Sequence, residues 1–140
     1  MVAPRRNEVN GIAGWLLLLC FVLLVWQPVS LALTAVRALE ALEIRGLPLA
    51  LVVLGQILVA GFGIAAGLAL ISRRRGAPAL AKWSLVLSAA ADMFVYATHF
   101  LPNNRLPGTT PLFMGASLVH YGIWLAYLTV SRRVRDTFPT

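Results

Sequence analysis

Four long apolar runs make up most of this 140-residue chain, and the charged residues lie almost entirely in the gaps between them. The runs cover about residues 11–36, 47–71, 80–101 and 112–130. A helix needs about 20 mostly apolar residues to cross a hydrocarbon core about 30 Å thick, because backbone groups without hydrogen-bond partners are not tolerated in lipid. The pattern therefore predicts an all-α fold, a four-helix transmembrane bundle of up-down-up-down topology that forms a single membrane domain over residues 1–140.

The first run is interrupted by a proline and is followed by a segment of mixed character. Pro28 removes the helical hydrogen-bond partner of the Leu24 carbonyl, which predicts a bend near Gln27. Residues 37–45 alternate charged and apolar side chains before Gly46, a residue that commonly ends helices. We therefore expect a short interfacial helix that extends the first span.

Composition excludes a water-soluble fold of this size, because 59% of the residues are hydrophobic, 12% are charged and the mean hydropathy is +0.81. The formal net charge of +7 does not indicate nucleic-acid binding, since the basic residues flank apolar runs instead of alternating with exposed aromatic residues. The expected partner is the lipid bilayer, with no nucleic acid. Cys20 is the only cysteine, so an intramolecular disulfide cannot form, and we expect a small core hydrophobe at this position.

The basic residues are divided unevenly between the two ends of the predicted spans. The larger group is Arg5, Arg6, Arg73, Arg74, Arg75, Lys82, Arg132, Arg133 and Arg135, and the smaller group is Arg37, Arg45 and Arg105. By the positive-inside rule the larger group faces the cytoplasm, so both termini are expected there. Anchoring to anionic lipid is the expected role of the basic loop at residues 73–82, with binding to an acidic partner as the alternative. The first run is longer than the apolar part of a signal peptide, and we expect it to be retained.

Two short motifs near the ends of the chain resemble a known family. Residues 11–16 read Gly-Ile-Ala-Gly-Trp-Leu, and residues 131–138 read Ser-Arg-Arg-Val-Arg-Asp-Thr-Phe. Together they resemble a family of small bacterial four-span inner-membrane proteins known only as a domain of unknown function, in which a glycine pair precedes Trp-Leu. Ala13 departs from that pattern. The resemblance implies the four-span architecture and the bacterial inner membrane, and it implies no activity.

Polar side chains in the last two spans fall on one face of each predicted helix. One stripe consists of Ser84, Ser88, Asp92, Tyr96 and His99, and the other consists of Ser117, His120, Trp124, Tyr127 and Ser131. Because an aspartate at the membrane centre costs about 2.5 to 3.5 kcal/mol on insertion, we expect the stripes to face each other and not lipid. A rise of about 1.5 Å per residue places Asp92, His120 and Gln56 at one depth. We therefore predict a buried polar layer of these residues, with Tyr96, His99 and Gln27 leading outward from it.

Four roles are open for this polar layer. In the first, Asp92 pairs with His120 and hydrogen-bonds Gln56 to select which helices meet, since a polar contact in a bilayer contributes about 0.6 kcal/mol. In the second, Asp92 and His120 titrate together in a proton or ion path. In the third, His99 or His120 is an axial ligand of haem or of a chlorophyll-type pigment, although the two histidines lie at different depths. The fourth is a lipid or quinone site between the helices.

Small residues crowd the second predicted span. Gly63 and Gly67 have the four-residue spacing that lets helices approach closely, and they share a face with Gln56 and Ala60. We expect this face to pack inside the bundle against the first or fourth span. Self-association or binding of a partner is the alternative.

The sequence contains no motif typical of an enzyme: no phosphate-binding loop, nucleophile elbow, zinc-protease pair or dinucleotide fingerprint. The gaps between spans are too short for a soluble catalytic domain. We therefore expect a structural or accessory subunit of a larger membrane complex, in contact with other subunits or with itself, and no enzyme. The alternative is a haem- or pigment-associated or proton-conducting membrane protein that uses His120 and Asp92.

Overall fold

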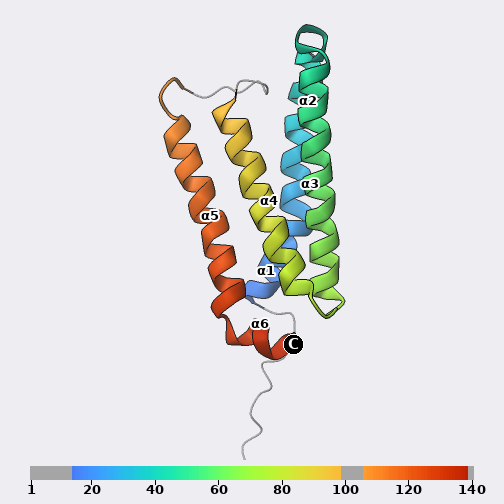
Figure 1. Cartoon of the computed structure of the whole chain (residues 1–140), viewed down its shortest axis with the longest axis vertical. Helices are drawn as coiled ribbons and strands as arrows, with labels where there is room; N and C mark the ends of the chain where they lie inside the picture. Colours follow the sequence, from blue (N-terminus) through green and yellow to red (C-terminus); the bar gives the residue numbers. More distant parts are fainter. Residues whose placement is uncertain (1–13, 99–105, 139–140) are drawn as a thin grey trace, which may run out of the picture.

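The structure, a computed structural model, describes residues 14–98 and 106–138, and every regular element in these ranges is helical. The elements are α1 (Trp15–Phe21), the π-helical segment η1 (Val22–Trp26), α2 (Gln27–Arg45), α3 (Leu47–Ile71), α4 (Ala77–Ala97), α5 (Thr110–Val130) and α6 (Arg132–Thr137) (Figure 1). The first three form one helix of 31 residues, and this helix, α3, α4 and α5 are each long and apolar enough to cross a membrane. The all-α fold with four spans is therefore confirmed, and so is the extension of the first span.

The first span contains a π-helical turn immediately before Pro28. There the N–H of Gln27 donates to the carbonyl of Val22, five residues earlier, where an α-helix would use the residue four earlier. Pro28 has no N–H, so the regular ladder of hydrogen bonds is already broken at this point. Because a π turn contains an extra residue, it changes which side chains of α2 face the bundle. Gln27, the first residue of α2, is directed inward by this turn, as its contacts below show.

Proline and glycine mark the starts of the later spans. Each of α3, α4 and α5 has a proline in its first turn. The N–H groups of the first turn make no hydrogen bond within the helix, so proline, which lacks an N–H, is tolerated there. Gly46 and Gly76 precede α3 and α4 with φ angles of 65° and 79°, which other residues rarely adopt. These tight turns make the successive spans antiparallel.

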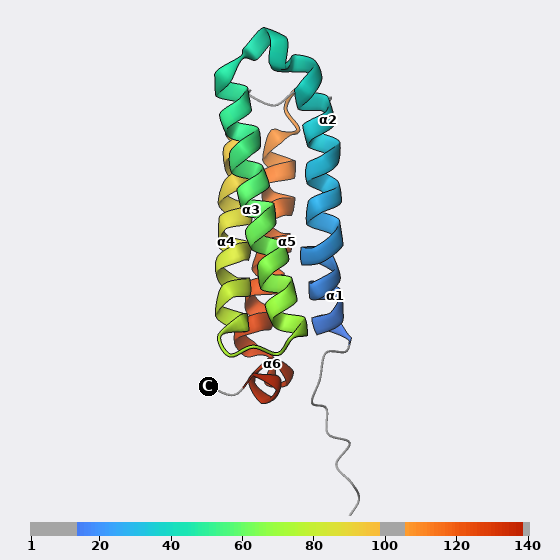
Figure 2. The ribbon, with the colours of Figure 1, turned by 90° about the vertical axis from the view of Figure 1, so that its right-hand side faces the viewer.

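The spans pack in chain order, α2 against α3, α3 against α4 and α4 against α5 (Figure 2). At the end that contains α1 the arrangement is closed, because Trp15 meets Trp124 of α5 with ring centroids 6.2 Å apart. We call this the closed end, and the opposite end, where Gly46 lies, the open end. The largest group in the core at the closed end is six leucines with no more than 2% exposure, namely Leu16, Leu19, Leu23, Leu70, Leu85 and Leu128. Cys20 belongs to the same core.

The short helix α6 lies across the closed end (Figure 1). Val134 and the residue that follows α6, Phe138, are 3% and 8% exposed and belong to the core described above. Arg132 and Arg135 are exposed. The turn between α3 and α4, with the exposed cluster Arg73–75, lies at this end too (Figure 1). The basic residues of both segments thus share one end of the bundle, whose cytoplasmic location remains a prediction.

Large apolar side chains cover the outside of the bundle. Leu58 on α3, Trp83 on α4 and Val119 on α5 are each more than 60% exposed. Such a surface suits contact with acyl chains and not with water. The four long helices and their apolar surface indicate a multi-pass membrane protein.

Candidate ligand-binding cavity

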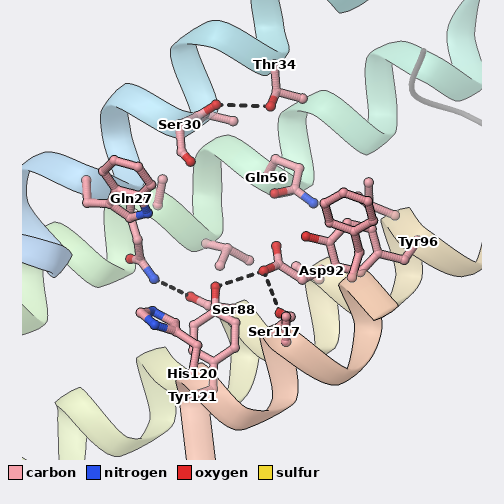
Figure 3. A pocket seen from close by; sticks show the side chains of 18 of the residues that line it. Gln27, Ser30, Thr34, Gln56, Ser88, Asp92, Tyr96, Ser117, His120 and Tyr121 are labelled. Atoms are coloured by element: carbon pink, nitrogen blue, oxygen red, sulfur yellow. Dashed lines mark hydrogen bonds between the residues drawn. The ribbon is translucent and has the colours of Figure 1, made fainter. Parts of the chain in front are cut away.

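A cavity of about 630 Å³ lies between the spans in the half of the bundle toward the open end. Its walls come from all four spans, and Figure 3 shows the side chains that face it. The polar members are Gln27, Ser30, Thr34, Arg37, Gln56, Ser88, Asp92, Tyr96, Ser117, His120 and Tyr121. Trp26 and Ser30 on one side and Phe113 and Ala116 on the other line the cavity and are also exposed. The cavity therefore opens sideways between the first span and α5, in addition to facing the open end.

Asp92 on α4 is the acidic group of this cavity. Its Oδ2 atom accepts a hydrogen bond from the Ser117 hydroxyl at 3.1 Å and another from the Tyr121 hydroxyl at 2.9 Å. Both donors belong to α5, four residues apart, so they lie on one face of that helix. Two hydroxyl donors on one oxygen stabilise a negative charge and hold the carboxylate in place.

Gln27 connects the first span to α4 and α3. Its Nε2 donates to the Ser88 hydroxyl at 2.9 Å, and its Oε1 lies against the backbone of Gly63. A Cβ at position 63 would collide with this amide oxygen, so glycine is what admits the glutamine between the helices. Among the residues described, neither Gln27 Oε1 nor the buried Ser84 hydroxyl has a hydrogen-bond partner in the protein.

Six residues were predicted for the buried polar layer and the path that leads outward from it. Five of them line this one cavity: Asp92, His120, Gln56, Tyr96 and Gln27. The sixth, His99, lies outside the described residues. His120 makes edge contacts with the rings of Tyr121 and Trp124, with centroids 5.1 Å and 6.4 Å away. A direct bond between Asp92 and His120 stays a prediction, since the bonds described above come from Ser117 and Tyr121.

Sequence reasoning missed Tyr121 and Arg37 as members of the site. Tyr121 directly follows His120 and was not part of either polar stripe, but its hydroxyl reaches Asp92. Its spacing of four from Ser117 was the available signal. Arg37 was assigned to the interfacial extension of the first span, whereas its side chain lines the cavity near the open end.

Two glycines of α3, Gly63 and Gly67, face the first span. A Cβ at Gly67 would lie 2.8 Å from Leu24 Cγ and 3.3 Å from Leu23 Cβ. Gly63 meets Gln27 in the same interface. This surface is occupied inside the chain, so it is not available to a partner helix.

The described residues contain no group of three or more histidine, cysteine, aspartate or glutamate side chains close enough to hold a metal ion. The cavity offers instead one carboxylate, one imidazole, one guanidinium at its rim and several hydroxyl and amide groups. Such a set can bind a polar molecule by hydrogen bonds and charge, with its aromatic rings contributing contact area.

Residues 9–139 match the model of a family described as "Protein of unknown function (DUF2569)". The chain belongs to this family. The match covers nearly the whole chain, and it confirms the resemblance seen in the two end motifs. No curated protein matches the chain, and no solved structure matches it either.

Proposed function

We propose that this protein is an accessory subunit of a larger membrane complex, and that its partner packs against the outer face of α5. The observation that carries the proposal is a row of small exposed residues on this helix, Gly115, Gly122 and Ala126. A Cβ at Gly115 or at Gly122 would meet nothing within 4 Å. Gly122 and Ala126 have the spacing that allows close helix packing in membranes.

The geometry of α5 supports this use. At 100° per residue, the three small residues lie on the side of the helix opposite Ser117 and His120, which face the cavity. Helix α5 is the last span in the packing order, with α4 as its main neighbour. A glycine inside a helix costs about 1 kcal/mol relative to alanine. Exposed glycines occur on α3 as well, so this cost alone does not identify an interface. On α5, however, two glycines and an alanine line up on one face, where close contact with a partner helix would offset the cost.

The packing at the closed end favours an accessory role over proton conduction. A proton path needs hydrogen-bonding groups across the whole membrane, whereas the layer beyond the cavity consists mainly of buried apolar side chains, with Leu16, Leu19 and Leu128 among them. The polar cavity thus extends through only one half of the bundle.

A pair of glycine substitutions tests the proposal. Gly122→Leu should reduce the size of the native complex extracted from host membranes in mild detergent, because the larger side chain would hold the partner away. Gly55→Leu is the matched control, since Gly55 on α3 is also exposed and also has nothing within 4 Å of a Cβ, but its neighbours four residues away, Leu51 and Val59, are large. Both variants should fold like the wild type.

The readout is the native mass and the subunit content of the complex. Loss of mass in Gly122→Leu but not in Gly55→Leu supports the proposal. A wild-type protein that runs as a single chain, or a complex that contains only copies of this chain, contradicts it.

A further inference from the structure

The cavity contains two opposite charges at different depths. Asp92 lies four residues beyond Ser88 on α4, and Arg37 lies ten residues beyond Gln27 on α2, where Gln27 and Ser88 are bonded to each other. With a rise of about 1.5 Å per residue, the Arg37 backbone stands about 9 Å nearer to the open end than the Asp92 backbone. A ligand with a positive group inside and a negative group at the rim would contact both charged groups.

The surroundings of Asp92 suit an ammonium group. Tyr96 and Phe113 line the cavity with ring centroids 6.4 Å apart, and Tyr121 and Trp26 contribute two further aromatic rings. Aromatic faces attract cations, and the attraction strengthens where water is excluded. The Asp92 carboxylate, held by two hydroxyl donors, provides the counter-charge.

The rim of the cavity suits a phosphate. A guanidinium group donates in a fork that matches two phosphate oxygens, and Arg37 is exposed where the cavity reaches the open end. The Ser30 and Thr34 side chains line the wall of α2 below it. Because the cavity also opens sideways between the first span and α5, the apolar part of an amphiphile can remain in the bilayer.

We propose that the cavity binds a zwitterion made of an ammonium and a phosphate, with the ammonium at Asp92 and the phosphate at Arg37. The volume of about 630 Å³ lies within the range of small-molecule sites, about 300 to 1,000 Å³. Two sources carry this chemistry, the headgroup of phosphatidylethanolamine in the membrane and free phosphoethanolamine from the aqueous phase. The site is separate from the outer face of α5, so it does not depend on the proposed partner.

Lipid retention measures this binding. The purified protein is reconstituted in nanodiscs that contain equal amounts of phosphatidylethanolamine and phosphatidylglycerol. It is then released into detergent, and native mass spectrometry identifies and quantifies the lipid that stays bound. The wild type should retain phosphatidylethanolamine in preference to phosphatidylglycerol. Asp92→Asn should lower that preference about tenfold, the change expected for one charge-assisted contact. Arg37→Gln should lower retention of both lipids.

The controls are charge changes outside the cavity. Asp136→Asn and Arg135→Gln alter exposed residues at the closed end and should leave retention unchanged. Displacement of the lipid by millimolar phosphoethanolamine would identify the free zwitterion as a ligand, whereas retention in its presence would identify the lipid headgroup.

Three results would overturn the proposal. The first is equal retention of the two lipids by the wild type, and the second is an unchanged preference in Asp92→Asn. The third is displacement of the lipid by tetrapropylammonium at the concentration at which phosphoethanolamine displaces it, which would leave no role for the phosphate. If Asp92→Asn does not fold, Arg37→Gln decides, because Arg37 is exposed and its loss should not affect folding. Wild-type retention in that variant would also overturn the proposal.

Discussion

The two ends of the bundle are built on different principles. At the closed end, α1, α3, α4, α5 and α6 meet in an apolar core with several fully buried leucines. Toward the open end, a cavity with many polar side chains on its walls separates the first span from α5. In a membrane, van der Waals packing holds helices together, because lipid tails are as apolar as the core. The closed end therefore supplies the packing that allows the other half to remain open and polar.

Because of this contrast, the same helices contribute to the packed core at one end and to the accessible cavity at the other. Helix α5, for example, has Leu128 in the packed core and Ser117 on the cavity wall. The change occurs near Trp124, whose ring contacts Trp15, His120 and Tyr127. Substitutions on the two sides of this residue should have effects of different kind and size.

The largest expected difference is in access to water. Cys20 is the only cysteine of the chain and is 1% exposed at the closed end, so a membrane-impermeant maleimide should not react with the native protein. Arg37→Cys, made with Cys20→Ala, places a thiol on the exposed rim where the cavity reaches the open end and should react readily. Mass spectrometry of the labelled protein measures both. Reaction at Cys20, or lack of reaction at position 37, would show that the two ends do not differ in their access to water.

The next largest effect is expected at the tryptophan that closes the bundle. Trp124 is 5% exposed and Trp83 is 64% exposed. Trp124→Ala should lower the free energy of unfolding by about 3 kcal/mol, because it leaves a void among packed rings. Trp83→Ala is the matched control and should change it little, since lipid replaces the lost contacts. Unfolding in mixed micelles with increasing SDS measures the two values, and equal losses would show that the closed end is not the more tightly packed part.

The sequence was sufficient for the fold, and the reason is physical. Charges and helix-ending residues bracket each apolar run, so the bounds expected for the second span, about 47–71, coincide with α3. The family suggested by the end motifs was confirmed as well. A bend near Gln27 was expected from Pro28, but a π-helical turn was not. Whether a π-helical turn forms depends on the contacts that its side chains make in the folded bundle. Here Gln27 donates a hydrogen bond to Ser88, on another helix.

The site was only partly predictable for a similar reason. The residues of the polar stripes could be listed from helical spacing, and Asp92, Gln56, Tyr96 and His120 do face one cavity. The sequence does not say that the first span and α5 stand apart, because this separation results from the packing of the whole bundle. Without the separation there is no reason to expect a cavity instead of a filled polar layer.

A smaller effect is expected from two glycines of α3. Gly67→Ala would place a Cβ 2.8 Å from Leu24 Cγ in the packed interface, and it should lower the free energy of unfolding by about 1 to 3 kcal/mol. Gly55→Ala meets nothing within 4 Å and should raise it by up to about 1 kcal/mol through better helix propensity. The same unfolding assay compares them. Opposite signs are the expected outcome, and a loss of equal size at both positions would contradict the packing described for the first span against α3.

The smallest effect is expected in the cavity itself. Tyr121→Phe removes one of the two hydroxyl donors of Asp92 and leaves the ring, so it should lower the free energy of unfolding by only about 0.6 kcal/mol, the average polar contribution in a bilayer. Tyr127→Phe is the control on the same helix, where the half-buried ring packs against Trp124. The two variants should differ more in ligand retention than in stability, since Asp92 loses a donor only in the first. A loss in Tyr121→Phe as large as that in Trp124→Ala would show that the polar contacts, and not the apolar core, hold the bundle together.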